Sequence, residues 1–176
     1  MPQTSLLRTA LVTVPAVLAL GLLSGWLANS GYGNPWFDAL RKPAIMPPGW
    51  VFGVVWTILY ILLGVVLALL LQARGTPGTS RLIGLFLVQL VLNYAWSPTF
   101  FALHKVSLAL AMIAAMIALT VALILLLFRD RRLAALLLMP YLAWLGFATA
   151  LNFEILMLNP DAEYLVPAPA NPDIRA

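Results

Sequence analysis

The stretch WVFGVVWTILYILLGVVLALLLQ, residues 50–72, carries no charged side chain and no proline. Its length matches the roughly 20 apolar residues that a helix needs to cross about 30 Å of hydrocarbon. Hydrocarbon cannot pair with backbone N–H and C=O groups, so a spanning segment has to form its hydrogen bonds internally, as a helix does. The stretch therefore predicts a membrane-spanning α-helix.

Four other uncharged runs of similar length lie in the chain. Together the runs predict five spans, at residues about 9–28, 50–72, 82–103, 106–128 and 133–153. The composition agrees, because 63% of the residues are hydrophobic and 9% are charged, against about 45–50% and 25% in soluble domains. We expect an all-α membrane protein, a five-transmembrane-helix bundle in one domain over residues 1–159, and hence a multi-pass integral membrane protein.

The connections between the spans differ in length and composition. Residues 29–49 form the longest connection, and its four prolines disfavour a regular helix. We expect a structured loop that covers one end of the bundle. The tail, residues 160–176, contains another four of the chain's 13 prolines and is expected to be disordered.

Basic residues are distributed unequally between the two ends of the expected bundle. The end that holds the N-terminus carries Arg8, Arg74, Arg81, Arg129, Arg131 and Arg132, and the other end carries Arg41, Lys42, Lys105 and Arg175. By the positive-inside rule, the six-arginine end faces the cytoplasm and the long first loop faces outward.

Several classes of site are excluded by the residues that the chain lacks. It has no cysteine and a single histidine, so disulfides, thiolate catalysis and clustered histidine metal ligands are not expected. His104 adjoins Lys105 in a short turn and is expected to face solvent or lipid headgroups. We expect no catalytic residue, no metal ligand, no required cofactor and no nucleic-acid partner.

Glycine and proline mark special points within the expected spans. Gly21 and Gly25 form a small-xxx-small pair, which fits either close helix packing or ordinary glycine use in membrane helices. Pro98 interrupts the hydrogen bonds of the third span, and Ser97 or Asn93 is a candidate to satisfy the freed carbonyl groups.

Aromatic and amide side chains share faces on three of the spans. The spacings i, i+3, i+4 and i+7 bring together Trp56 and Tyr60 in the second span, Gln89, Asn93 and Trp96 in the third, and Tyr141, Trp144 and Ala148 in the fifth. Flat aromatic walls with a few hydrogen-bonding groups suit a large planar apolar ligand. The alternative, which the sequence leaves equally open, is that the rings form interfacial belts and that Asn93 only bonds a neighbouring helix.

Four motifs extend this pattern along most of the chain. They are WFDALRKP at 36–43, PPGWVFGVVWTILY at 47–60, LNYAWSPTFF at 92–101, and PYLAW at 140–144 followed by ALNFE at 150–154. In these motifs the sequence resembles the translocator protein family, also called tryptophan-rich sensory proteins (TspO) or peripheral-type benzodiazepine receptor homologues.

The resemblance implies a five-helix bundle, usually a homodimer, that binds porphyrins such as haem and protoporphyrin, sterols, and isoquinoline carboxamide or benzodiazepine ligands beneath the first loop. It places the ligand-contacting positions at Phe37, Pro47, Trp56, Tyr60, Asn93, Trp96, Ser97, Trp144 and Ala148. The family often has one or two tryptophans where this chain has Ala44 and Ile45. The cholesterol-recognition pattern is also missing, because no Lys or Arg follows Tyr141 or Tyr164 within five residues.

Three functions remain open from the sequence. We expect a receptor, sensor or transporter that binds porphyrins or similar planar ligands within the bundle. The alternatives are an enzyme that degrades bound porphyrin photo-oxidatively, with Trp144 as electron donor, and a structural membrane protein without a small ligand. The two missing tryptophans weigh against the enzyme.

Overall fold

A computed structural model of the chain describes residues 5–165, and within this range the regular secondary structure is helical throughout. The elements are α1 Leu6–Leu27, α2 Pro35–Ala39, α3 Gly49–Gln72, α4 Thr79–Ser97, the π-helical turn η1 Pro98–Ala102, α5 Val106–Phe128, α6 Arg132–Leu158 and the 3-10 turn η2 Ala162–Tyr164. Five of these segments are long and apolar enough to cross a membrane, α4 and η1 counting as one. This confirms the expected all-α fold class and its five spans.

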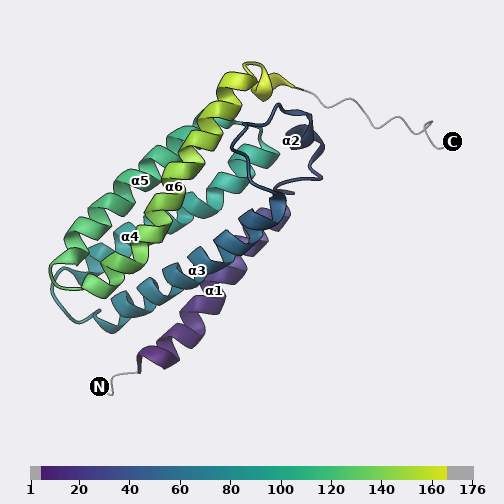
Figure 1. The fold of residues 1–176 in the computed structure, drawn as a ribbon. Helices are drawn as coiled ribbons and strands as arrows, with labels where there is room; N and C mark the ends of the chain where they lie inside the picture. Colours follow the sequence, from purple (N-terminus) through teal and green to yellow (C-terminus); the bar gives the residue numbers. More distant parts are fainter. Residues whose placement is uncertain (1–4, 166–176) are drawn as a thin grey trace.

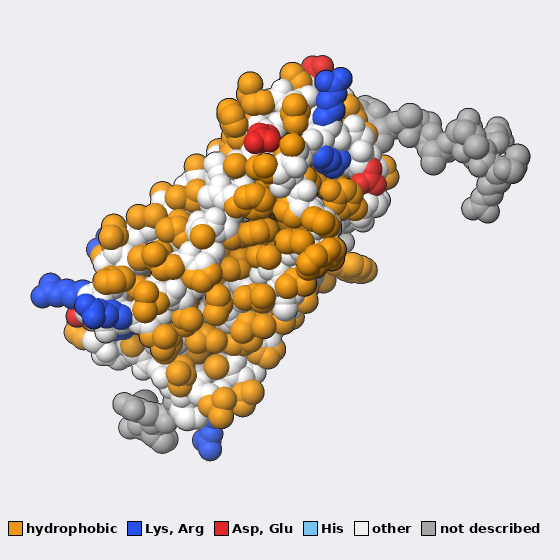
Figure 2. Space-filling view, in the orientation of Figure 1, with side chains coloured by type: hydrophobic (Ala, Val, Ile, Leu, Met, Phe, Trp, Pro, Cys, Tyr) orange, Lys and Arg blue, Asp and Glu red, His pale blue; other side chains and the backbone are white. Residues whose placement is uncertain are grey.

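The five long helices lie side by side in an elongated bundle (Figure 1). Helix α5 packs against α4 and α6, α1 packs along α3, and α3 also contacts α6. The outer faces of the long helices are largely apolar, and charged side chains gather at the two ends (Figure 2). An apolar surface of this extent is expected of a protein surrounded by lipid rather than water.

Helices α1 and α3 approach each other closely at two glycines. A Cβ atom on Gly64 would lie 2.6 Å from the Cα of Val14, and the Thr13 hydroxyl donates to the Gly64 carbonyl at 2.7 Å. A Cβ on Gly21 would lie 2.3 Å from the ring of Tyr60, whereas one on Gly25 would reach only Ser30. Of the glycine pair noted in the sequence, Gly21 is therefore the member that permits close packing.

The third span changes its helix type near its end. Pro98 has no N–H to bond the carbonyl of Tyr94, and from this proline onward the backbone forms the π-helical turn η1. The freed Tyr94 carbonyl accepts a hydrogen bond from the Ser24 hydroxyl of α1 at 2.5 Å. The expected partners, Ser97 and Asn93, do not bond the Tyr94 carbonyl, because Ser24 of α1 does so instead.

The connection between α1 and α3, residues 28–48, contains the short helix α2, although its prolines were expected to disfavour a regular helix. Pro35 is its first residue, where a missing N–H costs nothing. The Asn34 side chain caps the helix by accepting from the N–H groups of Trp36 at 3.0 Å and Phe37 at 3.1 Å. The number of prolines therefore did not predict the absence of a helix, because a proline at the first position of a helix does not disrupt it.

Part of the segment expected to be disordered is ordered in the structure. Residues 160–165 are part of the fold: η2 lies there and Ala162 is buried. Glu163 accepts a hydrogen bond from the backbone N–H of Ser107 in the first turn of α5 at 2.8 Å, and its carboxylate lies 3.8 Å from the Lys105 ammonium group. The remainder of that prediction, residues 166–176, lies outside the described residues.

Candidate functional site

Aromatic rings of α3 and α6 form a continuous wall in the half of the bundle nearer the loop. Trp56 stacks on Tyr60 with ring centroids 5.3 Å apart, and its edge meets Trp144 at 6.5 Å and Tyr141 at 6.5 Å. Trp144 also contacts Phe52 at 5.8 Å. The structure thus brings together the α3 and α6 faces that the sequence singled out.

A buried polar network lies behind this wall. The Asn93 side chain accepts from the Tyr60 hydroxyl at 3.0 Å and donates to the Tyr141 hydroxyl at 3.0 Å. Tyr141 also accepts from the Gln89 amide and donates to the Met116 sulfur at 3.6 Å. The network joins four helices, and Asn93 bonds two of its neighbours, α3 and α6.

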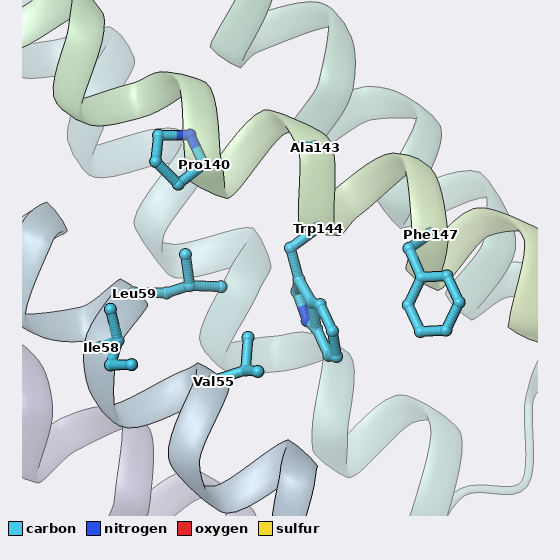
Figure 3. A pocket seen from close by; sticks show the side chains of 7 residues that line it. All are labelled: Val55, Ile58, Leu59, Pro140, Ala143, Trp144 and Phe147. Carbon is cyan, nitrogen blue, oxygen red and sulfur yellow. The ribbon is translucent and has the colours of Figure 1, made fainter. Parts of the chain in front are cut away.

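A hollow of about 430 Å³ opens between α3 and α6 on the outer side of the aromatic wall. Its lining residues are Val55, Ile58 and Leu59 of α3 with Pro140, Ala143, Trp144 and Phe147 of α6. Figure 3 shows the rings of Trp144 and Phe147 extending from α6 toward α3. We call this space the α3–α6 hollow; of the nine sequence-predicted site residues, Trp144 lines it.

The other predicted residues divide between two clusters. Tyr60 and Asn93 are buried in the polar network, with Trp56 beside them. Phe37 is buried beneath the loop, where its ring meets Phe101 at 5.2 Å. Trp96 stacks on Phe100 with ring centroids 5.0 Å apart. It packs against the hydrophobic core around Tyr60 and Tyr141 and also against the hydrophobic residues around Phe37, so it links the two regions.

Pro47, Ser97 and Ala148 are each half-buried, on the loop, at the end of α4 and on α6 respectively. Two polar atoms near these clusters have no partner among residues 5–165. They are the indole nitrogen of Trp96 and the side-chain oxygen of Gln89, both buried. Buried polar atoms are usually paired, so these two atoms are exceptions within the described part of the chain.

The sequence motifs contained Trp36, but nothing in them indicated how the loop is fastened. Trp36 is 1% exposed, its indole nitrogen donates to the Ala162 carbonyl at 2.9 Å, and its ring stacks on His104 at 4.4 Å. The backbone N–H of Arg41 donates to the side-chain oxygen of Asn159 at 2.8 Å, and the Asn159 side-chain amide donates to the Arg41 carbonyl at 3.0 Å. These contacts hold the loop against the ends of α4 and α6 and were not predictable from spacing along the chain.

The stacking of His104 on Trp36 differs from its expected solvent-facing role. Partial burial lowers the pKa of His104 below its ordinary 6.5, although a hydrogen bond with the Phe101 backbone opposes the shift. The neutral imidazole is therefore favoured in the folded state, and its contribution is complete above about pH 6.5 and is lost as the pH falls below that value. Glu163, whose pKa the Ser107 N–H holds below 4.5, stays ionised through this window.

We expect acidification from pH 7.5 to 5.5 to lower the protection factors of the amides in residues 34–42, which compare exchange with the intrinsic rate at each pH, and we expect a smaller change in His104→Gln. Exchange followed by mass spectrometry would measure both. An identical pH response in the two proteins would rule out His104 as the group responsible.

Residues 12–158 match the sequence profile described as the TspO/MBR family. This chain belongs to the TspO/MBR family. The tryptophan-rich protein TspO of Archaeoglobus fulgidus is 40% identical over 149 residues, which cover 84% of this chain and 94% of the relative. That of Chlorobaculum tepidum is 37% identical over 154 residues, covering 85% and 98%. The translocator protein of Homo sapiens is 37% identical over 137 residues, covering 77% and 81%.

TspO/MBR membership and five apolar helices together identify a multi-pass membrane protein of a sensor and translocator family. The resemblance noted in the motifs is thereby confirmed. The ligand-contacting roles of the nine residues stay predictions.

Proposed function

We propose that this TspO/MBR chain binds porphyrins, such as protoporphyrin or haem, or similar planar apolar molecules, against the aromatic wall of α3 and α6. The observation that carries the proposal is the α3–α6 hollow with Trp144 on its lining. Its volume of about 430 Å³ falls in the range of ordinary ligand pockets, roughly 300–1,000 Å³. The hollow lies between two helices rather than directly beneath the loop, where the family resemblance suggested the ligand.

The chemistry of the hollow suits such a ligand. The lining side chains are apolar, and Trp144 presents an indole whose neighbours Phe52, Trp56 and Phe147 hold it in place. A large aromatic ligand would gain stacking and buried area there at little cost in side-chain entropy. Ile58 on the rim is exposed, so a ligand dissolved in the bilayer would enter sideways without crossing water.

In this proposal the protein acts as a receptor, sensor or transporter, needs no cofactor, and takes the porphyrin as ligand. Isoquinoline carboxamide or benzodiazepine compounds are proposed as competing ligands of the same wall, and a homodimer as the assembly. Photo-oxidative breakdown of the ligand would show as a new absorbing product under light that disappears in Trp144→Phe.

A titration of the purified protein with protoporphyrin, followed through the porphyrin's own absorbance, tests the proposal. Trp144→Ala removes the stacking surface and is expected to weaken binding about tenfold, equivalent to ~1.4 kcal/mol. The matched control is Trp26→Ala, because Trp26 is 76% exposed on α1 and lies outside the hollow.

A second variant addresses the hollow without removing any aromatic ring. Ala143 lines the hollow and is exposed on α6, so Ala143→Leu fills space without disturbing the core. We expect it also to weaken binding. Full affinity in both folded variants would contradict a porphyrin site at this place.

A further inference from the structure

A second hollow has a volume of about 1050 Å³. The elements that line it meet at the end of the bundle opposite the α1–α3 loop (Figure 1). It is bounded by the first turns of α1, the end of α3 and the corner between α5 and α6. Its charged lining residues are Arg8, Arg74, Asp130, Arg131 and Arg132. We call it the arginine hollow; it shares no residue with the α3–α6 hollow.

The positive charge of this hollow is not balanced within the described part of the chain. The ion pair found among residues 5–165 joins Lys105 to Glu163, at the other end of the bundle. Arg131 is held by donating to the Thr79 hydroxyl at 2.7 Å, whereas within the same residues the side chains of Arg8 and Arg74 form no hydrogen bond. Asp130 is the one acid on the lining, which leaves a strong excess of positive charge.

The start of α6 adds to this positive field. Arg131 is the N-cap residue of α6, no side-chain hydrogen bond caps the helix there, and the first turn contains no acid. Leu133 and Ala134, in this first turn, line the hollow. The unpaired N–H groups and the positive end of the helix dipole favour an anion at the start of α6. Arg131 and Arg132 add further positive charge there, and a bound anion would offset their repulsion.

The apolar part of the lining indicates the kind of molecule that would bear the negative group. Val12 of α1, Leu69 of α3 and Leu133 of α6 line the hollow and belong to membrane spans. The arginines lie at the ends of the same spans, where a surrounding bilayer would place its headgroups. An occupant therefore needs a negative group beside the arginines and hydrocarbon beside the helices.

We propose that the arginine hollow binds the phosphate headgroup of an anionic phospholipid, whose acyl chains run along α1 and α6. The excess of arginine at this end directs it toward the cytoplasmic leaflet, where anionic lipids attract clustered Lys and Arg. The lipid would hold the start of α1 to the corner between α5 and α6, across a space that the side chains of residues 5–165 leave open.

Binding of phosphatidylglycerol to the full chain in detergent, measured by native mass spectrometry, tests this site. The wild-type protein is expected to bind phosphatidylglycerol in preference to phosphatidylcholine. Arg8→Gln combined with Arg74→Gln removes two lining charges, and we expect roughly 30-fold weaker binding, from about 1 kcal/mol per basic residue. Neither side chain forms a hydrogen bond or ion pair within residues 5–165, so the fold should survive, which thermal unfolding in phosphatidylcholine would verify.

The matched control is Arg81→Gln combined with Arg129→Gln. It removes the same charge from the same end of the bundle, but neither residue lines the hollow. An equal loss in both double variants would show general attraction to the charged end and would overturn the site. Inorganic phosphate competing as strongly as the lipid would assign the hollow to a free anion and would overturn the lipid.

Discussion

Gly64→Ala is expected to lower the free energy of unfolding by about 1–3 kcal/mol, the usual cost of overpacking a tight contact. The added Cβ would lie 2.6 Å from the Cα and 3.1 Å from the backbone nitrogen of Val14. A flexible side chain could turn away from such a clash, but backbone atoms cannot, so the whole of α1 has to move. That movement would also stretch the 2.7 Å hydrogen bond from the Thr13 hydroxyl to the Gly64 carbonyl.

Thermal unfolding in detergent measures this effect, which we expect as a midpoint roughly 3–10 °C lower. Gly146→Ala is the matched control, because Gly146 lies in α6 and a Cβ there would meet nothing within 4 Å. The control also corrects for the higher helix propensity of alanine. Equal midpoints for the two variants would show that α1 and α3 are not packed as closely as described.

Tyr141→Phe should destabilise the bundle by removing the hydroxyl at the centre of the polar network. The amides of Gln89 and Asn93 would each lose an acceptor, and Tyr141 is fully buried, so no water replaces it. An unpaired buried donor costs about 1–3 kcal/mol, although hydrogen bonds between membrane helices average nearer ~0.6 kcal/mol. Gln89 would be affected most, since its side-chain oxygen already lacks a partner among residues 5–165.

The double variant Tyr141→Phe with Gln89→Leu distinguishes the cost of leaving the Gln89 amide unpaired from the cost of losing its hydrogen bond. Replacing both partners by apolar groups is expected to recover much of the stability. Tyr32→Phe controls for the loss of a hydroxyl, because Tyr32 is exposed in the loop. A Tyr141→Phe protein as stable as Tyr32→Phe would mean that the network does not hold the helices together.

The five helices could be predicted closely because charged residues are excluded from hydrocarbon. The observed bounds of α5 are those expected, whereas α1 begins a few residues before its expected span and α6 ends a few residues after its own. Helical spacing also gave the contact of Trp56 with Tyr60 correctly. These features depend on local sequence and on the surrounding lipid, both of which the chain itself reveals.

Pairing between helices could not be predicted in the same way. Helical spacing placed Asn93 on a face with aromatic residues. It did not show that the Asn93 side chain forms hydrogen bonds with Tyr60 and Tyr141. Likewise, Ser24 and Tyr94 are separated by a long stretch of sequence, and only folding brings them together. The position of the α3–α6 hollow depends on how side chains fill the space between helices, which spacing does not determine.

The contacts of η2 have a practical consequence for the handling of this protein. Ala162 provides the acceptor for Trp36, and Glu163 provides the cap for α5. A shortened chain that ends at Asn159 would lose both, even though all five hydrophobic helices would still be encoded. Affinity tags and fluorescent fusions are therefore best joined beyond Leu165, where they leave both contacts in place.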